Sequence, residues 1–327
     1  VGNVSMRSTG PSVSEKRIDA LPKIKREGEE TAMSEFLSAN LPYLLSGISV
    51  GGQYALIAIG YTMVYGILRL INFAHGDVFM VAGLMMVYLS ASLPLYLAIP
   101  IMVILTVALG FLIEKVAYKP LRSAPRMSVM ISAIGVSYLL QNCALYFTGG
   151  LPQIYPTIPF LSEQVQIGSA TTKMVTIITP ILTIVLVLLL VLMIKRTKTG
   201  MAMRAVSRDF ETSELMGIKI NNVISMTFVI GCFLAAIGSL LYFTNYNSVI
   251  PTSGAMPGLK AFVAAVFGGI GSVPGAVIGA FIIGICENII KGLGLTEFSD
   301  AFTFVLLIVI LLVKPTGIFG EKSTDKV

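Results

Sequence analysis

Residues 174–194 read MVTIITPILTIVLVLLLVLMI, a run of 21 residues without a charge that ends at Lys195 and Arg196. The hydrocarbon core of a bilayer is about 30 Å thick, so a helix needs roughly 20 apolar residues to cross it. This run therefore predicts a membrane-spanning helix. Three other uncharged stretches have a similar length, and a shorter apolar run follows near the C-terminus: residues 94–113, 127–147, 221–245 and 300–313.

The composition supports a membrane protein. Hydrophobic residues make up 55% of the 327 residues, charged residues 12%, and the mean hydropathy is +0.85. A typical soluble domain is about 25% charged, so a soluble globular protein and a disordered chain are both excluded. The net charge of +6 does not indicate a nucleic-acid partner, because the basic residues lie between apolar stretches and form no single patch.

The apolar stretches predict helices and not strands. No two-residue alternation of apolar and polar positions separated by turns is present, which argues against a β-barrel. Helices are the other way to satisfy the backbone within lipid. We therefore predict an all-α fold, a polytopic transmembrane helical bundle with about eight to ten crossings.

The distribution of Lys and Arg orients the bundle, because cytoplasmic loops carry an excess of these residues. The loops at 114–126 and 195–219 are basic and should be cytoplasmic, as should the C-terminal tail with Lys314. The loops at 148–172 and 246–259 contain no Lys or Arg and should be external.

Two parts of the chain leave the exact number of crossings open. We expect short segments at about 260–273, 275–290 and 300–313, whereas residues 41–73 form either one helix with a re-entrant piece or two short helices. Of the possible totals we favour an even number, with both termini cytoplasmic.

The two ends of the chain differ from the membrane domain at 34–320. Residues 1–33 are polar and hold many of the charges, so we predict a disordered tail. Met33 stands directly before the apolar part, and our hypothesis is that it lies close to the natural start and that the tail is non-native. Residues 321–327 should form a cytoplasmic tail.

A small polar cluster stands out at Asn72, His75 and Asp77, within apolar surroundings. Asp77 and His75 could pair, and Asn72 could cap a helix break. The cluster is then either a turn between helices or part of a solute path or gate. It has too few ligands for a zinc site, and the chain shows no set of catalytic residues and no C-x-x-C pair, so we predict neither a catalytic nor a metal site.

Two further features could belong to a path. Glu287 is an ionisable residue within an apolar stretch, which is a functional hypothesis by default, although Lys291 four residues later suits an ordinary ion pair. The glycine-rich run with Pro274 favours either close helix packing or a broken helix that lines the path. Its glycines are Gly268, Gly269, Gly271 and Gly275.

The cytoplasmic loop at 195–219 is helical in propensity, mixed in charge and bracketed by glycines. It is either a solvated loop or a docking helix for a cytoplasmic partner. The chain has no G-x-x-x-x-G-K-[ST] phosphate-binding run, so any motor that energises transport must be another subunit.

Several motifs in register carry a family resemblance. The chain resembles the branched-chain amino acid ABC-transporter permeases of the LivH type over about residues 34–320. The motifs that carry the resemblance lie at residues 52–62, 71–77, 114–122, 131–142, 200–218, 258–276 and 314–318.

The resemblance implies a bacterial inner-membrane permease subunit with a fold like that of type II ABC importers, for leucine, isoleucine and valine. It implies a second homologous permease, two cytoplasmic ATPases that use ATP and Mg, and a periplasmic amino-acid-binding protein. This chain itself would bind no cofactor. The family's coupling segment corresponds to Gly200, Arg204, Ala205, Asp209 and Gly217.

Other functions remain open at this point. The solute could be urea, a short amide, a sugar or another small polar molecule, since the sequence near the path does not exclude these. An ion-coupled secondary transporter acting alone is a further alternative. The scarcity of intramembrane acids and the docking loop weigh against it, and a membrane enzyme lacks a plausible catalytic set.

Overall fold

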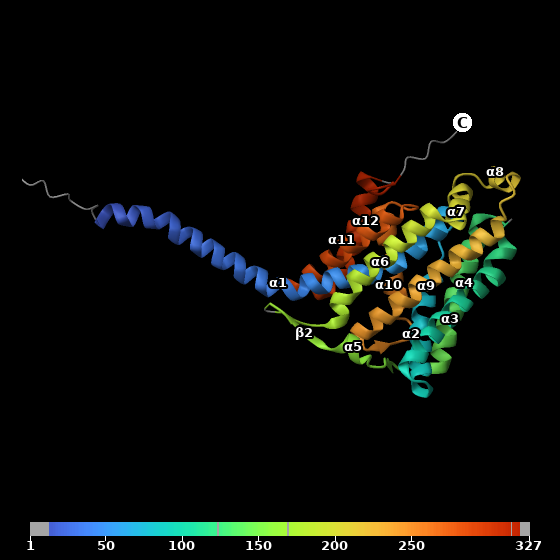
Figure 1. Ribbon diagram of the computed structural model, residues 1–327, viewed down its shortest axis with the longest axis horizontal. Helices are drawn as coiled ribbons and strands as arrows, with labels where there is room; N and C mark the ends of the chain where they lie inside the picture. The colour runs from blue at the N-terminus through green and yellow to red at the C-terminus, as the bar shows by residue number, and fades with distance from the viewer. Residues whose placement is uncertain (1–12, 123, 169, 315, 321–327) are drawn as a thin grey trace, which may run out of the picture.

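The computed structural model describes residues 13–122, 124–168, 170–314 and 316–320, and shows a bundle of helices (Figure 1). Eight helices of the described part are long and apolar enough to cross a membrane, and α10 is a shorter apolar helix. The predicted all-α bundle of about eight to ten crossings is therefore confirmed. The main helices are α1 (Val13–Leu68), α2 (His75–Ser92), α3 (Leu95–Ile113), α4 (Arg126–Thr148), α6 (Met174–Arg196), α9 (Ile220–Tyr246), α10 (Ala255–Gly268), α11 (Val273–Gly292) and α12 (Ser299–Val313).

Short elements join the helices at both ends of the bundle. At the cytoplasmic end, α3 continues as the π-helix η1 (Glu114–Tyr118) and the 3-10 turn η2 (Lys119–Leu121), and α7 (Lys198–Arg208) and α8 (Phe210–Leu215) follow α6. At the opposite end lie α5 and two antiparallel strand pairs, β1 with β4 and β2 with β3. Their bounds are α5 (Pro159–Ser162), β1 (Gln153–Ile154), β2 (Gln164–Ile167), β3 (Ala170–Lys173) and β4 (Ser248–Val249).

The strand pairs connect loops that lie far apart in the sequence. Gln153 of β1 is opposite Val249 of β4, so the 148–172 and 246–259 loops meet on one side of the bundle. The charge pattern places both loops outside, and α7 and α8 lie at the other end of the helices (Figure 1). The two loops that lack positive charge therefore share one side of the bundle, as the positive-inside rule predicts.

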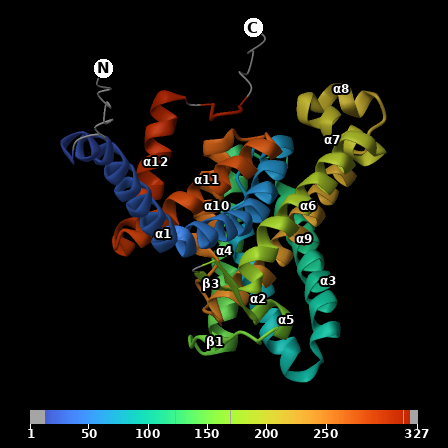
Figure 2. The ribbon, with the colours of Figure 1, turned by 60° about the vertical axis from the view of Figure 1, so that its left-hand side comes forward.

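The centre of the bundle is formed by α1, α9, α10 and α11, while α4, α6 and α12 lie on its outside (Figures 1 and 2). Helices α1 and α11 approach each other most closely around Gly51 and Gly284. A Cβ on Gly51 would lie 2.8 Å from the Cα of Phe281, so the missing side chain lets the backbones touch. Close backbone approach at small residues is how helices associate within lipid.

The first helix differs from the sequence-based predictions in two ways. Residues 41–68 form one continuous helix, followed by a turn, with no re-entrant piece and no second helix. Helix α1 also begins at Val13, so residues 13–33 are helical and project from the bundle (Figure 1), where composition predicts disorder. The remaining tail residues, 1–12, and the C-terminal residues 321–327 lie outside the described part.

The direction of α1 corrects the predicted topology. Leu41 lies beside Gly168 of the external hairpin β2–β3, whereas Leu68 lines a cavity together with Phe210 of α8. The helix thus runs from the external to the cytoplasmic side. With the shorter α10 counted, nine apolar helices lie between residue 40 and Lys314 in the described part, an odd number that matches an external residue 40 and a cytoplasmic Lys314. The favoured even number with two cytoplasmic termini is therefore wrong for the described span.

The charge pattern requires an odd number of crossings between residue 260 and Lys314, and three apolar helices, α10, α11 and α12, follow residue 254. The first of them, α10, occupies 255–268 and lies about five residues earlier than the predicted 260–273. The break between α10 and α11 lies at the glycines themselves, because Gly269 and Gly271 have φ values of +106° and +97° that favour glycine.

Candidate functional site

The cytoplasmic loop folds into two short helices set at an angle beyond the end of α6 (Figure 2). The hydroxyl of Thr197 accepts a hydrogen bond from the backbone N–H of Gly200 and caps α7. Gly200 is buried against the last turn of α6, where a Cβ would collide with the backbone of Ile194. The glycine therefore allows the sharp bend that turns the chain from α6 into α7.

Helix α8 is fixed by its own cap. The carboxylate of Asp209 accepts hydrogen bonds from the backbone N–H of Thr212 at 3.1 Å and from its hydroxyl at 2.6 Å. Gly217 ends the segment with φ of +80°. Of the predicted coupling residues, Gly200, Asp209 and Gly217 thus shape the loop, and Ala205 accepts the capping N–H of Asp209 through its carbonyl.

Several side chains of this loop are exposed on the predicted cytoplasmic side, among them one cation and two apolar residues at the end of α8. Arg204 is exposed, and its guanidinium donates one long bond of 3.4 Å to the carbonyl of Lys195. Leu215 and Met216 at the end of α8 are 88% and 78% exposed. Two large apolar side chains are thus exposed outside the membrane spans; they lie within the loop that the sequence singled out but were not among its five predicted coupling residues.

A cavity of about 700 Å³ lies behind α8 at the cytoplasmic end of the bundle. Its wall includes Leu68 at the end of α1, Tyr118 of η1 and Phe210 of α8. Beside it, the buried carboxylate of Glu114 pairs with Arg122 and accepts a 2.8 Å bond from the hydroxyl of Ser225 on α9. The cavity and this ion pair connect the loop to the ends of three transmembrane helices.

The predicted cluster at the start of α2 is brought together only in part. His75 and Asp77 do not pair with each other. The His75 ring packs edge-on to Tyr61 with centroids 5.1 Å apart, and its Nε2 fits against Gly60, where a Cβ would collide with the ring. Nε2 has no hydrogen-bond partner among the described residues.

Asn72 has a different role from the predicted helix cap. Its side-chain oxygen accepts a 2.6 Å hydrogen bond from the hydroxyl of Tyr118, and both residues are buried. The N-terminal position of α2 is occupied by Ala74 without a side-chain cap. Asn72 therefore ties the turn after α1 to η1 beside the cytoplasmic cavity.

Asp77 is held by α4. Its carboxylate accepts a 2.5 Å bond from the hydroxyl of Ser137 and a 3.0 Å bond from the amide of Gln141. These two residues lie near the middle of the span at 127–148, so the buried carboxylate sits well inside the membrane region. The sequence separation of about 60 residues hides these partners from sequence reasoning.

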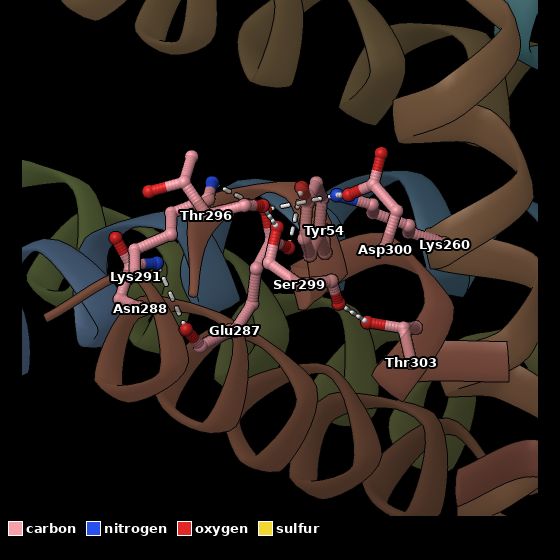
Figure 3. Close-up of polar contacts among 10 residues, drawn as sticks. Tyr54, Lys260, Glu287, Asn288, Lys291, Thr296, Ser299, Asp300 and Thr303 are labelled. Atoms are coloured by element: carbon pink, nitrogen blue, oxygen red, sulfur yellow. Dashed lines mark hydrogen bonds and ion pairs between the residues drawn. The ribbon is translucent and has the colours of Figure 1, made fainter. Parts of the chain in front are cut away.

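Glu287 is the centre of a buried ionic network (Figure 3). Its Oε1 accepts hydrogen bonds from the ammonium groups of Lys260 at 2.8 Å and Lys291 at 2.6 Å, and its Oε2 accepts one from the hydroxyl of Tyr54 at 3.0 Å. The second carboxylate, that of Asp300, pairs with Lys260 at 2.6 Å. The predicted i,i+4 pair with Lys291 is confirmed, but Lys260 was missed.

The network joins four helices and balances its own charge. Tyr54 comes from α1, Lys260 from α10, Glu287 and Lys291 from α11, and Asp300 from α12. Two ammonium groups face two carboxylates, which compensates much of the cost of burying each charge. This arrangement supports helix packing, and a path or gate role of Glu287 stays a prediction.

The glycine-rich run lies in densely packed surroundings. Gly268 at the end of α10 and Gly275 at the start of α11 face each other so closely that a Cβ on either would collide with the other's carbonyl. Gly269 in turn packs against Gly320 and the C-terminal segment. The run breaks the helix between α10 and α11 and also packs the two helix ends closely, and its place beside a solute path stays a prediction.

Comparisons with known proteins agree with one another. The model of the family described as branched-chain amino acid transport system, permease component, matches residues 43–311. The permease protein LivH of Salmonella typhimurium is 41% identical, over 90% of this chain and all of that protein. BraD of Pseudomonas aeruginosa, a high-affinity branched-chain amino acid permease protein, is 39% identical over 88% of this chain and 98% of its own length.

A more distant relative has a different named solute. The ribose import permease protein RbsC of Haemophilus influenzae is 26% identical over 78% of this chain and 79% of its own length.

Proposed function

This chain belongs to the family of permease components of branched-chain amino acid transport systems, and we propose that it forms one half of a path through which ATPase subunits drive branched-chain amino acids inward. It is a transport subunit and a multi-pass protein of the inner membrane. The proposed solutes are leucine, isoleucine and valine, after the solute class in the names of relatives that are about 40% identical.

The proposed assembly has four kinds of component. A second homologous permease completes the path, two cytoplasmic ABC ATPases consume ATP with Mg, and a periplasmic amino-acid-binding protein delivers the solute. The charges of a zwitterion are costly to move through hydrocarbon. A path between two permeases shields both charges, so the permease itself needs few polar groups.

One observation carries the proposed coupling to ATPases. The α7–α8 loop lies beyond the ends of the membrane helices and exposes Leu215, Met216 and Arg204 on the side that the charge pattern makes cytoplasmic. An exposed apolar pair and an exposed cation on the same loop suit the surface of a partner. Movement of that partner would reach the bundle through the short connection from α8 to α9, as a rigid-body transition.

We expect Arg204→Glu to lower ATP-driven leucine uptake roughly tenfold, the size of a 1.4 kcal/mol change in the contact with the ATPase. The folded permease should stay intact, because the one long hydrogen bond of Arg204 contributes little. The measurement is radiolabelled leucine uptake and ATP hydrolysis in proteoliposomes that contain all components. Lys198→Glu, an equal change of charge at another exposed position of α7, is the control and should retain most of the uptake. Normal uptake and normal stimulation of ATP hydrolysis by Arg204→Glu would show that the loop does not dock the ATPase through this residue.

A further inference from the structure

Two helices on the outside of the bundle are equally exposed but differ in polarity. In both α4 and α6, 17% of the most apolar stretch is buried within the chain. The mean hydropathy of that stretch is 1.4 in α4 and 3.2 in α6. Equal exposure with such different polarity indicates that the two helices face different surroundings in the membrane.

The exposed face of α6 matches lipid. Its large exposed residues are all aliphatic and follow one another along the helix: Ile181, Ile184, Val185, Leu188, Leu189 and Leu192. Acyl chains are as apolar as these side chains, so such a face needs no protein or water next to it.

The exposed face of α4 mixes apolar and polar side chains: Ile131, Leu139 and Leu145 are exposed, and one stripe between them carries two phenols and an amide. Gly135, Tyr138, Asn142 and Tyr146 are exposed and lie three or four residues apart, so they form one stripe along the helix. We call these four residues the α4 stripe. The amide of Asn142 donates a 2.8 Å bond to the carbonyl of Tyr138, which satisfies one of its donors, but the group remains exposed near the middle of the span. Facing lipid, this amide and the phenol of Tyr138 would lack water, at a cost in free energy.

A buried negative charge lies on the inner edge of α4. Asp77 accepts hydrogen bonds from Ser137 and Gln141, which lie beside the α4 stripe on the helix. Within the described part of the chain, no Lys, Arg or His nitrogen comes within ion-pair distance of this carboxylate. Its field therefore favours cationic groups near the middle of α4, where the dielectric constant is low.

We propose that the α4 stripe lines the water-filled solute path, with the ammonium group of a zwitterionic amino acid passing on the side of Asp77. This inference deepens the proposed function and rests on it, since a second permease must supply the opposite wall. It assigns Tyr138 and Asn142 as residues that meet the solute and α6 as a helix that meets lipid.

The test is the reactivity of introduced cysteines in the assembled transporter in membrane vesicles. The background replaces the native thiols by Cys143→Ser, Cys232→Ala and Cys286→Ala. The test variants are Tyr138→Cys and Asn142→Cys, and the matched control is Leu188→Cys, since Tyr138 and Leu188 are 62% and 63% exposed. The probe is a charged, membrane-impermeant methanethiosulfonate, which reacts with the thiolate and therefore requires water at the thiol.

We expect both α4 cysteines to react at least tenfold faster than Leu188→Cys, and leucine to slow their reaction. Equal rates at the three positions, whether all fast or all slow, would overturn the proposal. In that case the α4 stripe faces lipid or is sealed against protein.

A second readout applies even if the triple replacement does not fold. Asn142→Leu in the otherwise native chain should lower leucine uptake several-fold without reducing the amount of folded permease. If Asn142 faced lipid, its replacement by Leu would leave uptake unchanged, and that result would overturn the assignment. Labelling does not depend on energy coupling. Rapid labelling of the α4 cysteines together with uptake that needs no ATPase would refute the proposed function but support α4 as a wall of the path. ATP-driven uptake together with unreactive α4 cysteines would support the proposed function and refute the assignment of α4.

Discussion

Replacing Glu287 by Gln is expected to remove most of the folded permease from detergent extracts. The substitution keeps the size of the side chain but removes the carboxylate that holds Lys260 and Lys291 at 2.8 and 2.6 Å. Lys260 is buried and would keep only the carboxylate of Asp300 as an ionic partner. Breaking a buried ion pair in this way costs about 3–5 kcal/mol, a large part of the 5–15 kcal/mol that stabilises a typical domain.

The matched control for this prediction removes the opposite charge. Lys260→Met leaves Glu287 paired with Lys291, and Asp300 is 46% exposed, so water can solvate its carboxylate. We expect Lys260→Met to be clearly less destabilising, and to restore part of the stability when it is combined with Glu287→Gln. Thermal unfolding monitored by size-exclusion chromatography measures all three variants. If Glu287→Gln were as stable as Lys260→Met, the network would not be a main support of the bundle.

Gly268→Ala is expected to disrupt the cytoplasmic ends of α10 and α11. The added Cβ would meet the carbonyl oxygen of Gly275, which belongs to the backbone and cannot rotate away. The same region is fastened by the C-terminal segment, where the N–H groups of Ile318 and Phe319 donate to the carbonyls of Phe267 and Gly268, each at 3.0 Å. Overpacking typically costs about 1–3 kcal/mol. Here the contact between Gly268 and Gly275 and the hydrogen bonds to the C-terminal segment would be strained together.

The control for this prediction is Gly66→Ala in α1. The nearest atom to its added Cβ would be the Cα of Gly271 at 3.7 Å, an ordinary contact. Alanine also favours the helix by roughly 0.5–1 kcal/mol. Gly66→Ala should therefore unfold at the native temperature or above it, and Gly268→Ala several degrees lower. Equal unfolding temperatures would mean that the contact between Gly268 and Gly275 relaxes at little cost.

Much of the bundle could be predicted from local sequence. The uncharged runs at 127–147, 174–194 and 221–245 became α4, α6 and α9 within about a residue at most ends, because crossing a bilayer imposes one length and one polarity. The positive-inside rule placed the two external loops on the same side. Helix α10 was harder to place, because a 14-residue helix is too short to give a full hydropathy signal.

The N-terminal part of the fold was predicted less well. Charge density in residues 13–33 indicated disorder, yet this segment continues α1 as a helix. The direction of α1 could not be derived either, because it depends on the tertiary fold. Leu41 lies beside the β2–β3 hairpin, and Leu68 lines the same cavity as Phe210 of α8. Loop charge carried no clear signal ahead of the first span.

The polar contacts, too, could be predicted from the sequence only in part. A pair four residues apart, Glu287 with Lys291, follows from helix geometry alone. The partners of Asp77 do not, since they come from α4, and the proximity of His75 suggested a pair that does not form. Lys260 could have been found, because a lysine within an apolar stretch requires a buried acid nearby, and Glu287 was already singled out.

The central claim is that this chain transports its solute only as part of an ATP-driven assembly. The direct measurement is leucine uptake into proteoliposomes that contain the purified permease with and without its co-purifying subunits. Uptake that requires the second permease, both ATPases, the binding protein and hydrolysable ATP is the predicted result. Leucine uptake by this chain alone, with no ATP in the lumen or outside, would contradict the account.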